Sequence, residues 1–145
     1  MLLSGIYGRY GLYSSPEFIC PEAIETLVWN FERPYRPSWL QHYVDKWNLG
    51  PTKYAVIFSG NDADHLDGLF KFSFQEKTKT LITKGTLVNP TYRKRGVAKQ
   101  MWALAIDELK PNKIIAFAST RDGLRFINKM KKKYPNIIWK IEETL

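Results

Sequence analysis

A group of positive side chains stands where the sequence turns into a helix. Arg93, Lys94 and Arg95 are followed by Gly96, and apolar residues then recur at helical spacing. Positive charge at this end of a helix opposes the backbone dipole, so these cations do not serve helix stability alone. The first amides of a helix have no internal partner and, beside a glycine that lets the backbone approach closely, they form a receptor for phosphate. We therefore predict an anion site at residues 93–98; the alternative is a solvated basic turn.

The composition of the chain agrees with an anionic partner. The 145 residues carry a formal net charge of +8 at pH 7, and a surplus of lysine and arginine raises the local concentration of anions. A phosphorylated cofactor and a nucleic acid both fit this charge. The length is that of one ordinary domain, so we expect residues 1–145 to form a single domain with its own core.

Other features of the composition bear on location and metal content. No apolar run approaches the ~20 residues that cross a bilayer, and Gly and Tyr interrupt the first 15 residues, where a signal peptide needs an unbroken apolar core. The single Cys20 provides neither an internal disulfide nor a cysteine cluster for zinc. We expect a cytoplasmic protein with no membrane partner and no metal.

The first half of the chain predicts helices followed by antiparallel strands. In chain order, hydrophobic spacing and turn residues predict a strand within 5–13, helices within 15–31 and 36–50, a strand at 53–60, and an antiparallel hairpin or meander at 66–88. The tight turn of this hairpin falls at residues 76–79.

The second half predicts a helix, a strand, a helix and a strand. The helix after the basic loop has a stripe that we expect to pack on the core, made of Ala98, Trp102, Ala105 and Leu109. A buried strand at 112–119, a helix at 120–134 and a last strand at 136–143 follow. This order predicts an α+β fold with a mixed, mostly antiparallel central sheet flanked by helices and a late βαβ unit.

The stretch from Val88 to Ala98, VNPTYRKRGVA, resembles a pyrophosphate-binding motif. Arg93, Gly96 and Ala98 match the signature of the GNAT superfamily of acyl-CoA-dependent N-acetyltransferases: Arg or Gln, two residues, Gly, one residue, then Gly or Ala. The expected order of elements is also similar to that fold over nearly the whole chain. The resemblance implies an acyltransferase that transfers an acetyl or other acyl group from acetyl-CoA to an amine acceptor.

The resemblance also implies which residues hold the acetyl-CoA. Backbone groups of one strand would contact the pantetheine arm along an edge that is splayed open, and the amides of residues 95–98 would hold the pyrophosphate. The implied cofactor-binding residues are Thr86, Leu87, Val88, Arg93, Lys94, Arg95, Gly96, Val97, Ala98, Lys99 and, from the next strand-helix unit, Thr120.

One residue that the family uses is missing here. In that next unit the family usually carries an Asn, an Ala and a Tyr, of which the Tyr protonates the departing thiolate; these places fall on Thr120, Gly123 and Ile127. Isoleucine cannot donate a proton, so the acid is another residue, a water or no residue. Tyr134 follows two helical turns later, too far to replace it.

A general base is not evident from the sequence either. An alkylamine with a pKa of about 10 must lose a proton before it attacks a thioester. The strand residues 80–88 carry no carboxylate, which leaves His42, His65, Asp67 and Glu76 as candidates. Each of these has a simpler structural explanation, so we assign no catalytic residue.

The remaining basic residues leave the acceptor open. Four lysines, Lys129, Lys131, Lys132 and Lys133, lie near the end of a helix, where a solvated helix end is the simpler interpretation and a nucleic-acid contact is the other. Two alternatives to an ordinary amine acetyltransferase follow. One is an acyl-CoA-dependent modification of a nucleic acid base, similar to the phage Mom-type proteins, and the other is a catalytically degenerate CoA- or nucleic-acid-binding module. The last strand could also pair between two chains of a dimer.

Overall fold

The structure is a computed structural model, and it describes residues 10–13, 53–58, 68–88 and 92–144. Within these ranges the elements are β1 (Tyr10–Tyr13), β2 (Lys53–Phe58), β3 (Gly68–Gln75), β4 (Thr80–Val88), α3 (Val97–Leu109), β5 (Lys113–Ala118), α4 (Arg121–Lys133) and β6 (Ile138–Glu143). The helices predicted within 15–31 and 36–50 lie outside the described residues. No helix in the described part of the chain is both long and apolar enough to cross a membrane.

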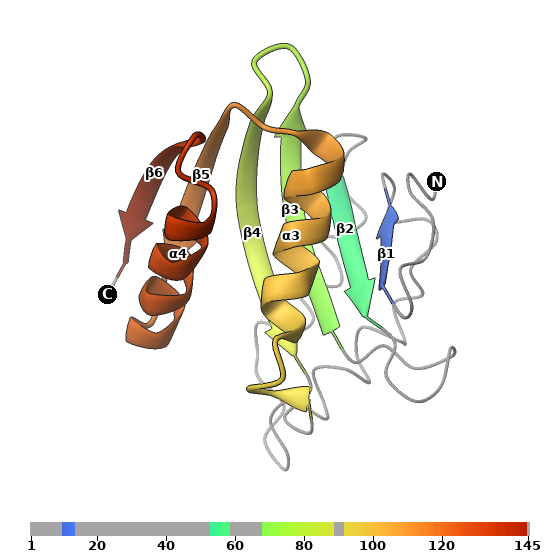
Figure 1. Cartoon of the computed structure of the whole chain (residues 1–145), viewed down its shortest axis with the longest axis vertical. Helices are drawn as coiled ribbons and strands as arrows, with labels where there is room; N and C mark the ends of the chain where they lie inside the picture. The colour runs from blue at the N-terminus through green and yellow to red at the C-terminus, as the bar shows by residue number, and fades with distance from the viewer. Residues whose placement is uncertain (1–9, 14–52, 59–67, 89–91, 145) are drawn as a thin grey trace.

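The strands form one mixed sheet in the order of the sequence, from β1 to β6 (Figure 1). β1, β2, β3 and β4 pair antiparallel, whereas β4 with β5 and β5 with β6 pair parallel. α4 connects the two parallel strands β5 and β6, so these three elements form the predicted βαβ unit. The fold is therefore the predicted α+β class with a mixed, mostly antiparallel sheet.

The hairpin of β3 and β4 forms the centre of the sheet. Three phenylalanines alternate along β3, and Phe70, Phe72 and Phe74 are all buried in the main core. The turn at residues 76–79 reverses the chain as predicted, with Lys79 in the left-handed region at φ 51°. A bulge shifts the pairing with β4 between Lys71 and Phe72. Because a bulge adds one residue to a strand, the side chains of β4 beyond it change face.

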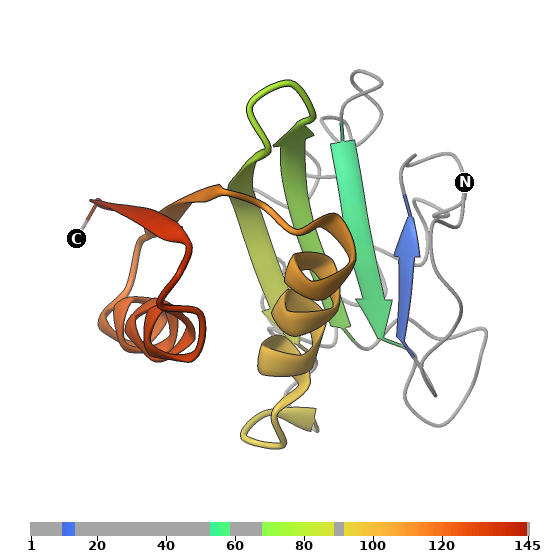
Figure 2. The same ribbon diagram turned by 45° about the horizontal axis from the view of Figure 1, so that its top comes forward.

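Both helices pack on the same core, α3 against β2, β3 and β4, and α4 against β5 and β6 (Figures 1 and 2). The indole of Trp102 in α3 stacks on Phe70, with ring centroids 4.8 Å apart. The predicted stripe on this helix is confirmed for three of its four residues. Trp102 and Ala105 are buried in the core, and the half-buried Leu109 packs against it. Ala98, in the first turn, is half-buried and is not part of this core cluster.

β4 and β5 pair over only part of their lengths. Thr80, Leu81 and Ile82 have Cα partners in β5. One residue further on, the amide of Phe117 donates a hydrogen bond to the side-chain hydroxyl of Thr83, over 3.1 Å. The register contains no partner beyond this point, and β5 diverges from β4 (Figure 1). The Thr83 side chain thus makes the last hydrogen bond between the two strands before they separate.

Replacing Thr83 with valine should destabilise the protein. Thr83 is 4% exposed, and valine keeps its shape but removes the acceptor of the Phe117 amide. This hydrogen bond is only partly buried, so its loss should lower the free energy of unfolding by about 0.5–1.5 kcal/mol, the net contribution of a typical hydrogen bond. Urea denaturation followed by circular dichroism would measure the change. Thr83→Ser keeps the hydroxyl and should lose only the ~0.8 kcal/mol of one buried carbon. A valine variant as stable as the wild type would show that the hydrogen bond contributes nothing.

Candidate functional site

The basic loop opens into a cavity of about 620 Å³ between α3 and α4. Its lining comprises Val88 of β4, Tyr92, Arg93, Lys94, Gly96, Val97, Ala98 and Lys99 of the loop and the start of α3, and Phe126, Lys129, Met130 and Lys133 of α4. Five of these residues are cations and none is acidic. We call this space the loop cavity, and its charge favours an anionic occupant.

The start of α3 faces the loop cavity with uncapped amides. Gly96 is the N-cap, at φ 78° and ψ 14°, where glycine has no steric penalty. The first helical bond runs from the Gln100 amide to the Gly96 carbonyl, over 3.0 Å, so the amides of residues 97–99 precede it. No side chain caps this end, and the first turn contains no acidic residue. The helix start therefore offers N–H donors and the positive end of its dipole to an anion.

A second cavity, of about 580 Å³, lies where β4 and β5 separate, and we call it the strand cavity. Its lining comprises Thr83, Lys84, Gly85, Thr86 and Leu87 of β4, Trp102 of α3, and Phe117, Ala118, Ser119, Thr120, Gly123, Phe126 and Ile127 of β5 and α4. The Trp102 indole nitrogen donates to the Thr86 hydroxyl oxygen over 3.0 Å. Phe126 borders both cavities, so the two are neighbours.

The residues that the sequence assigns to one site border these two cavities, with one exception. Thr86, Leu87 and Thr120 line the strand cavity. Val88, Arg93, Lys94, Gly96, Val97, Ala98 and Lys99 line the loop cavity. Arg95 belongs to neither lining, and its guanidinium carbon lies 5.7 Å from the centroid of the Tyr92 ring.

The sequence analysis missed the part of the site that α4 contributes. Phe126, Lys129, Met130 and Lys133 line the loop cavity, whereas the lysines were assigned to a solvated helix end. The exposed positions of all four lysines agree with that assignment, and the structure adds that Lys129 and Lys133 border the cavity. The sequence did contain a signal for this part of the site. Counted from Phe126, the other three lining residues follow at three, four and seven positions, which places all four on one face of a helix.

Comparison with known proteins bears on the identity of this site. A family model described as the acetyltransferase (GNAT) family matches residues 22–129, which is well over half of the chain. The chain belongs to the GNAT acetyltransferase family. No curated protein sequence matches it at a significant level.

Solved structures that resemble this GNAT chain include several N-acetyltransferases. The ribosomal-protein-S18-alanine N-acetyltransferase from Escherichia coli has a TM-score of 0.62 at 13% identity, and the match covers 83% of this chain and 76% of that one. Ribosomal-protein-alanine N-acetyltransferase from Brucella melitensis biovar Abortus 2308 has a TM-score of 0.59 at 16% identity, covering 83% and 89%. AAC(6′)-Iy, solved with a CoA-containing bisubstrate analogue, has a TM-score of 0.54 at 15% identity, covering 78% and 81%. At these identities the similarity shows a shared fold.

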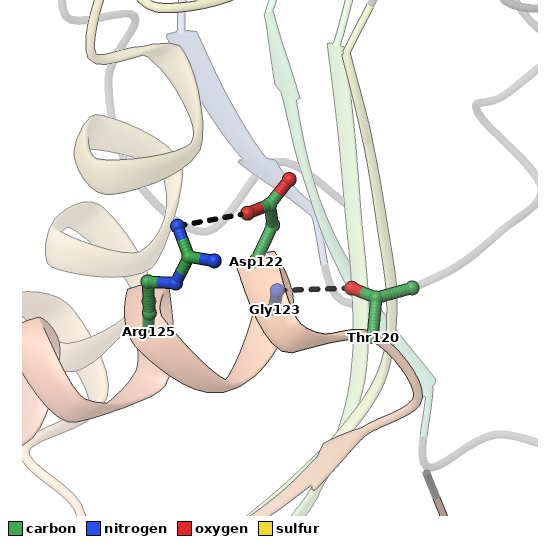
Figure 3. A network of polar contacts seen from close by, with 4 residues as sticks. All are labelled: Thr120, Asp122, Gly123 and Arg125. Atoms are coloured by element: carbon green, nitrogen blue, oxygen red, sulfur yellow. Dashed lines mark hydrogen bonds and ion pairs between the residues drawn. The ribbon is translucent and has the colours of Figure 1, made fainter.

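The GNAT position that usually carries Asn is a helix cap in this chain. Thr120 is the N-cap of α4, and its side-chain oxygen accepts a hydrogen bond from the Gly123 amide over 2.9 Å (Figure 3). Asp122 and Arg125 form an exposed ion pair, at 3.3 Å, on the same turn. A Cβ at Gly123 would lie 3.1 Å from the Thr120 oxygen. The alanine that the family usually carries there would require the Thr120 side chain to shift by a few tenths of an ångström.

The GNAT position that usually carries the tyrosine acid is apolar and buried. Ile127 is 2% exposed and borders the strand cavity. Tyr134 lies in neither cavity lining, and its hydroxyl donates to an Asp107 oxygen of α3 over 3.1 Å. Burial, followed by the charge and hydrogen bond of Asp107, raises the pKa of Tyr134 to about 12. A phenol that keeps its proton so firmly, outside the site, does not replace the missing acid.

Only one of the four candidate bases, Glu76, lies within the described residues. It belongs to the turn between β3 and β4, where it accepts a 3.4 Å hydrogen bond from the Tyr54 hydroxyl. This turn is at the opposite end of β4 from the strand cavity, so Glu76 is too distant to act there. His42, His65 and Asp67 are outside the described part. Among the described residues, no three His, Cys, Asp or Glu side chains are grouped in a way that could hold a metal ion.

Asp107→Asn should lower the pKa of Tyr134 without returning it to the ordinary value of 10.0. Burial is the largest cause of the raised pKa, and the substitution removes only the charge. Carbon NMR of labelled tyrosine rings during a pH titration would measure it, with Tyr134→Phe identifying the signal.

The same raised pKa predicts the sign of a pH effect on stability. The folded state holds the Tyr134 proton more firmly than the unfolded state, so this contribution is complete below about pH 10 and is lost as the pH rises toward 12. The Tyr134→Phe variant should lack this part of the alkaline loss. A Tyr134 pKa that does not change in Asp107→Asn would contradict the contact between α3 and α4.

Proposed function

We propose that the protein is an acyl-CoA-dependent N-acetyltransferase that transfers an acetyl or related acyl group to an amine. The observation that carries this proposal is the pair of adjoining cavities, one with cations at a helix start and one between separated strands. Family membership supports acyl transfer as the reaction class. Bound acyl-CoA supplies an activated acyl group, and in the overall reaction a C–N bond forms to the amine while the C–S bond of the thioester breaks.

The loop cavity has the donors that a pyrophosphate needs. The amides of residues 95–98 surround the helix start, and Gly96 leaves space around its α-carbon, since a Cβ there would meet no atom within 4 Å. Arg93 and Lys94 add positive charge beside these amides. Lys99, in the first turn of α3, extends the charge toward outer phosphates. A bound pyrophosphate would offset the unfavourable interaction between these cations and the positive end of the helix dipole.

The strand cavity fits an extended arm that carries amides. Beyond Ile82 the side of β4 that faces β5 has no strand partner, so the backbone groups of residues 86–88 remain available for hydrogen bonds. An extended chain can bind such an edge as an added strand does. Trp102, Phe126 and Ile127 give this path apolar walls. The Thr86 hydroxyl oxygen accepts the Trp102 N–H, which leaves its own hydrogen available to donate into the cavity.

The chemistry at this site relies on positioning more than on acid-base side chains. The strand cavity lining contains one titratable side chain, Lys84, and no carboxylate, imidazole or phenol. Bringing an amine and a thioester together in a fixed geometry supplies a large part of a bimolecular barrier, about 7–11 kcal/mol in favourable cases. The proton of the amine then leaves to water or to a group outside the described residues. A weakly basic amine, which is neutral at pH 7, suits such a site best.

Replacing Gly96 with aspartate should abolish CoA binding, whereas asparagine should weaken it much less. Both residues tolerate the left-handed backbone at φ 78°, and they have nearly the same size. Only aspartate brings a negative charge to the helix start, so we expect at least a ten-fold larger loss of affinity for aspartate than for asparagine. Isothermal titration with acetyl-CoA and CoA would measure both variants beside the wild type. Equal losses in the two variants would show that bulk, not charge, disturbs the site.

Turnover and nucleic acid binding need separate measurements. Release of free CoA thiol in the presence of a panel of alkyl and aromatic amines would demonstrate transfer, and CoA binding without thiol release on any amine would indicate a degenerate binding module. A short DNA duplex titrated at low and moderate salt tests the remaining alternative. Duplex binding with a steep salt dependence and no CoA binding would mean that the loop contacts a phosphodiester backbone.

A further inference from the structure

The lysines of α4 divide into two pairs with different surroundings. Lys131 and Lys132 are exposed at the last turn, where positive charge is favourable to the helix dipole. Lys129 and Lys133 also have high exposure, but both line the loop cavity together with Phe126 and Met130. Lys129 and Lys133 are four residues apart, so they lie one above the other on the helix face that borders the cavity. The dipole argument applies to Lys133 as well, because it lies in the last turn, but it does not explain why Lys129 and Lys133 both border a cavity that already contains three other cations.

Holding Lys129 and Lys133 together has a cost when no anion is bound. Like charges four residues apart destabilise a helix by a few tenths of a kcal/mol, and three further cations of the loop and α3 line the same cavity. Neither lysine belongs to the ion pair of Asp122 with Arg125 or to that of Lys140 with Glu142. Lys133 also lies 5.4 Å from the centroid of the Tyr134 ring, which limits where its ammonium group can go.

We propose that Lys129 and Lys133 form a second phosphate subsite, separate from the helix start, which binds the terminal phosphomonoester of CoA and makes the protein selective for CoA over dephospho-CoA. This inference rests on the proposed function. CoA carries a pyrophosphate and a 3′-phosphate on its ribose, and dephospho-CoA lacks only the latter. The helix start and its loop cations accommodate the pyrophosphate, so the charge on α4 is in excess of what that group requires.

The charges of the ligand and the cavity support this division. A phosphomonoester carries roughly −1.5 to −2 charges at pH 7, which two ammonium groups neutralise. Lysine suits such a group because it binds phosphate as a point charge and needs no fixed planar geometry. The backbone amides that serve the pyrophosphate belong to α3, whereas Lys129 and Lys133 belong to α4. The two subsites should therefore be separable by mutation.

The test is a cycle of two ligands and two matched variants, measured by isothermal titration on the full chain. Lys129→Gln/Lys133→Gln changes the cavity pair, and Lys131→Gln/Lys132→Gln removes the same charge from the same helix outside the cavity. We expect the wild type to bind CoA about ten-fold or more tightly than dephospho-CoA. The cavity variant should lose most of this preference and bind dephospho-CoA as the wild type does. The control variant should keep the preference in full.

The possible outcomes distinguish this inference from the proposed function. If the cavity variant weakens the binding of CoA and dephospho-CoA by the same factor, the lysines act through general charge, and the subsite does not exist. If the control variant loses as much of the preference for CoA over dephospho-CoA as the cavity variant does, the subsite likewise does not exist. A wild type that binds both ligands equally overturns the subsite but leaves the proposed function intact. A wild type that binds neither ligand overturns both.

Discussion

The separation of β4 from β5 is the constraint on which the rest of the site depends. Parallel strands that stayed paired along their full lengths would use their backbone groups on each other and leave no room between them. Here the pairing ends after Ile82, and the Thr83 hydroxyl takes the next amide of β5. The sheet is therefore continuous where β4 begins and opens between β4 and β5 where β4 ends. The cavity that forms there needs no movement of a loop or domain.

The packing of α3 and α4 beside this opening connects it to the basic loop. Trp102 stacks on Phe70 and meets Phe126 edge-on, with centroids 5.0 Å apart, so three aromatic rings join the hairpin, α3 and α4. Tyr134 and Asp107 join the two helices a second time. These contacts set the two helices at the separation that leaves the loop cavity between them. The phenol and carboxylate of this pair serve the architecture and are not available for proton transfer.

The helix start shows a local conflict between stability and binding. An acidic residue or a serine cap would have stabilised α3, and the chain has instead a left-handed glycine and a run of cations. α4 provides the contrast, because Thr120 caps it, Asp122 lies in its first turn and lysines occupy its last. Two helices of equal length that pack on one sheet thus differ at their starts. The difference is consistent with an anion site at one of them and an ordinary structural terminus at the other.

The sequence alone determined the features that depend on neighbouring residues. Gly96 after three cations predicted an open helix start, and alternating phenylalanines predicted β3. The missing tyrosine at Ile127 was identified from the resemblance to the GNAT family, and no local pattern indicated it. Only the tertiary structure decided that β4 and β5 separate after Ile82 and that Lys129 and Lys133 border the same cavity as Arg93. Residues 93 and 129 are joined by a helix, a strand and most of a second helix, and the path back to the loop depends on parallel pairing and on helix packing. Periodicity describes residues that are close in the sequence and does not indicate which distant segments come together. The residues that α4 contributes to the site could therefore be identified only from the packing of the βαβ unit in the tertiary structure.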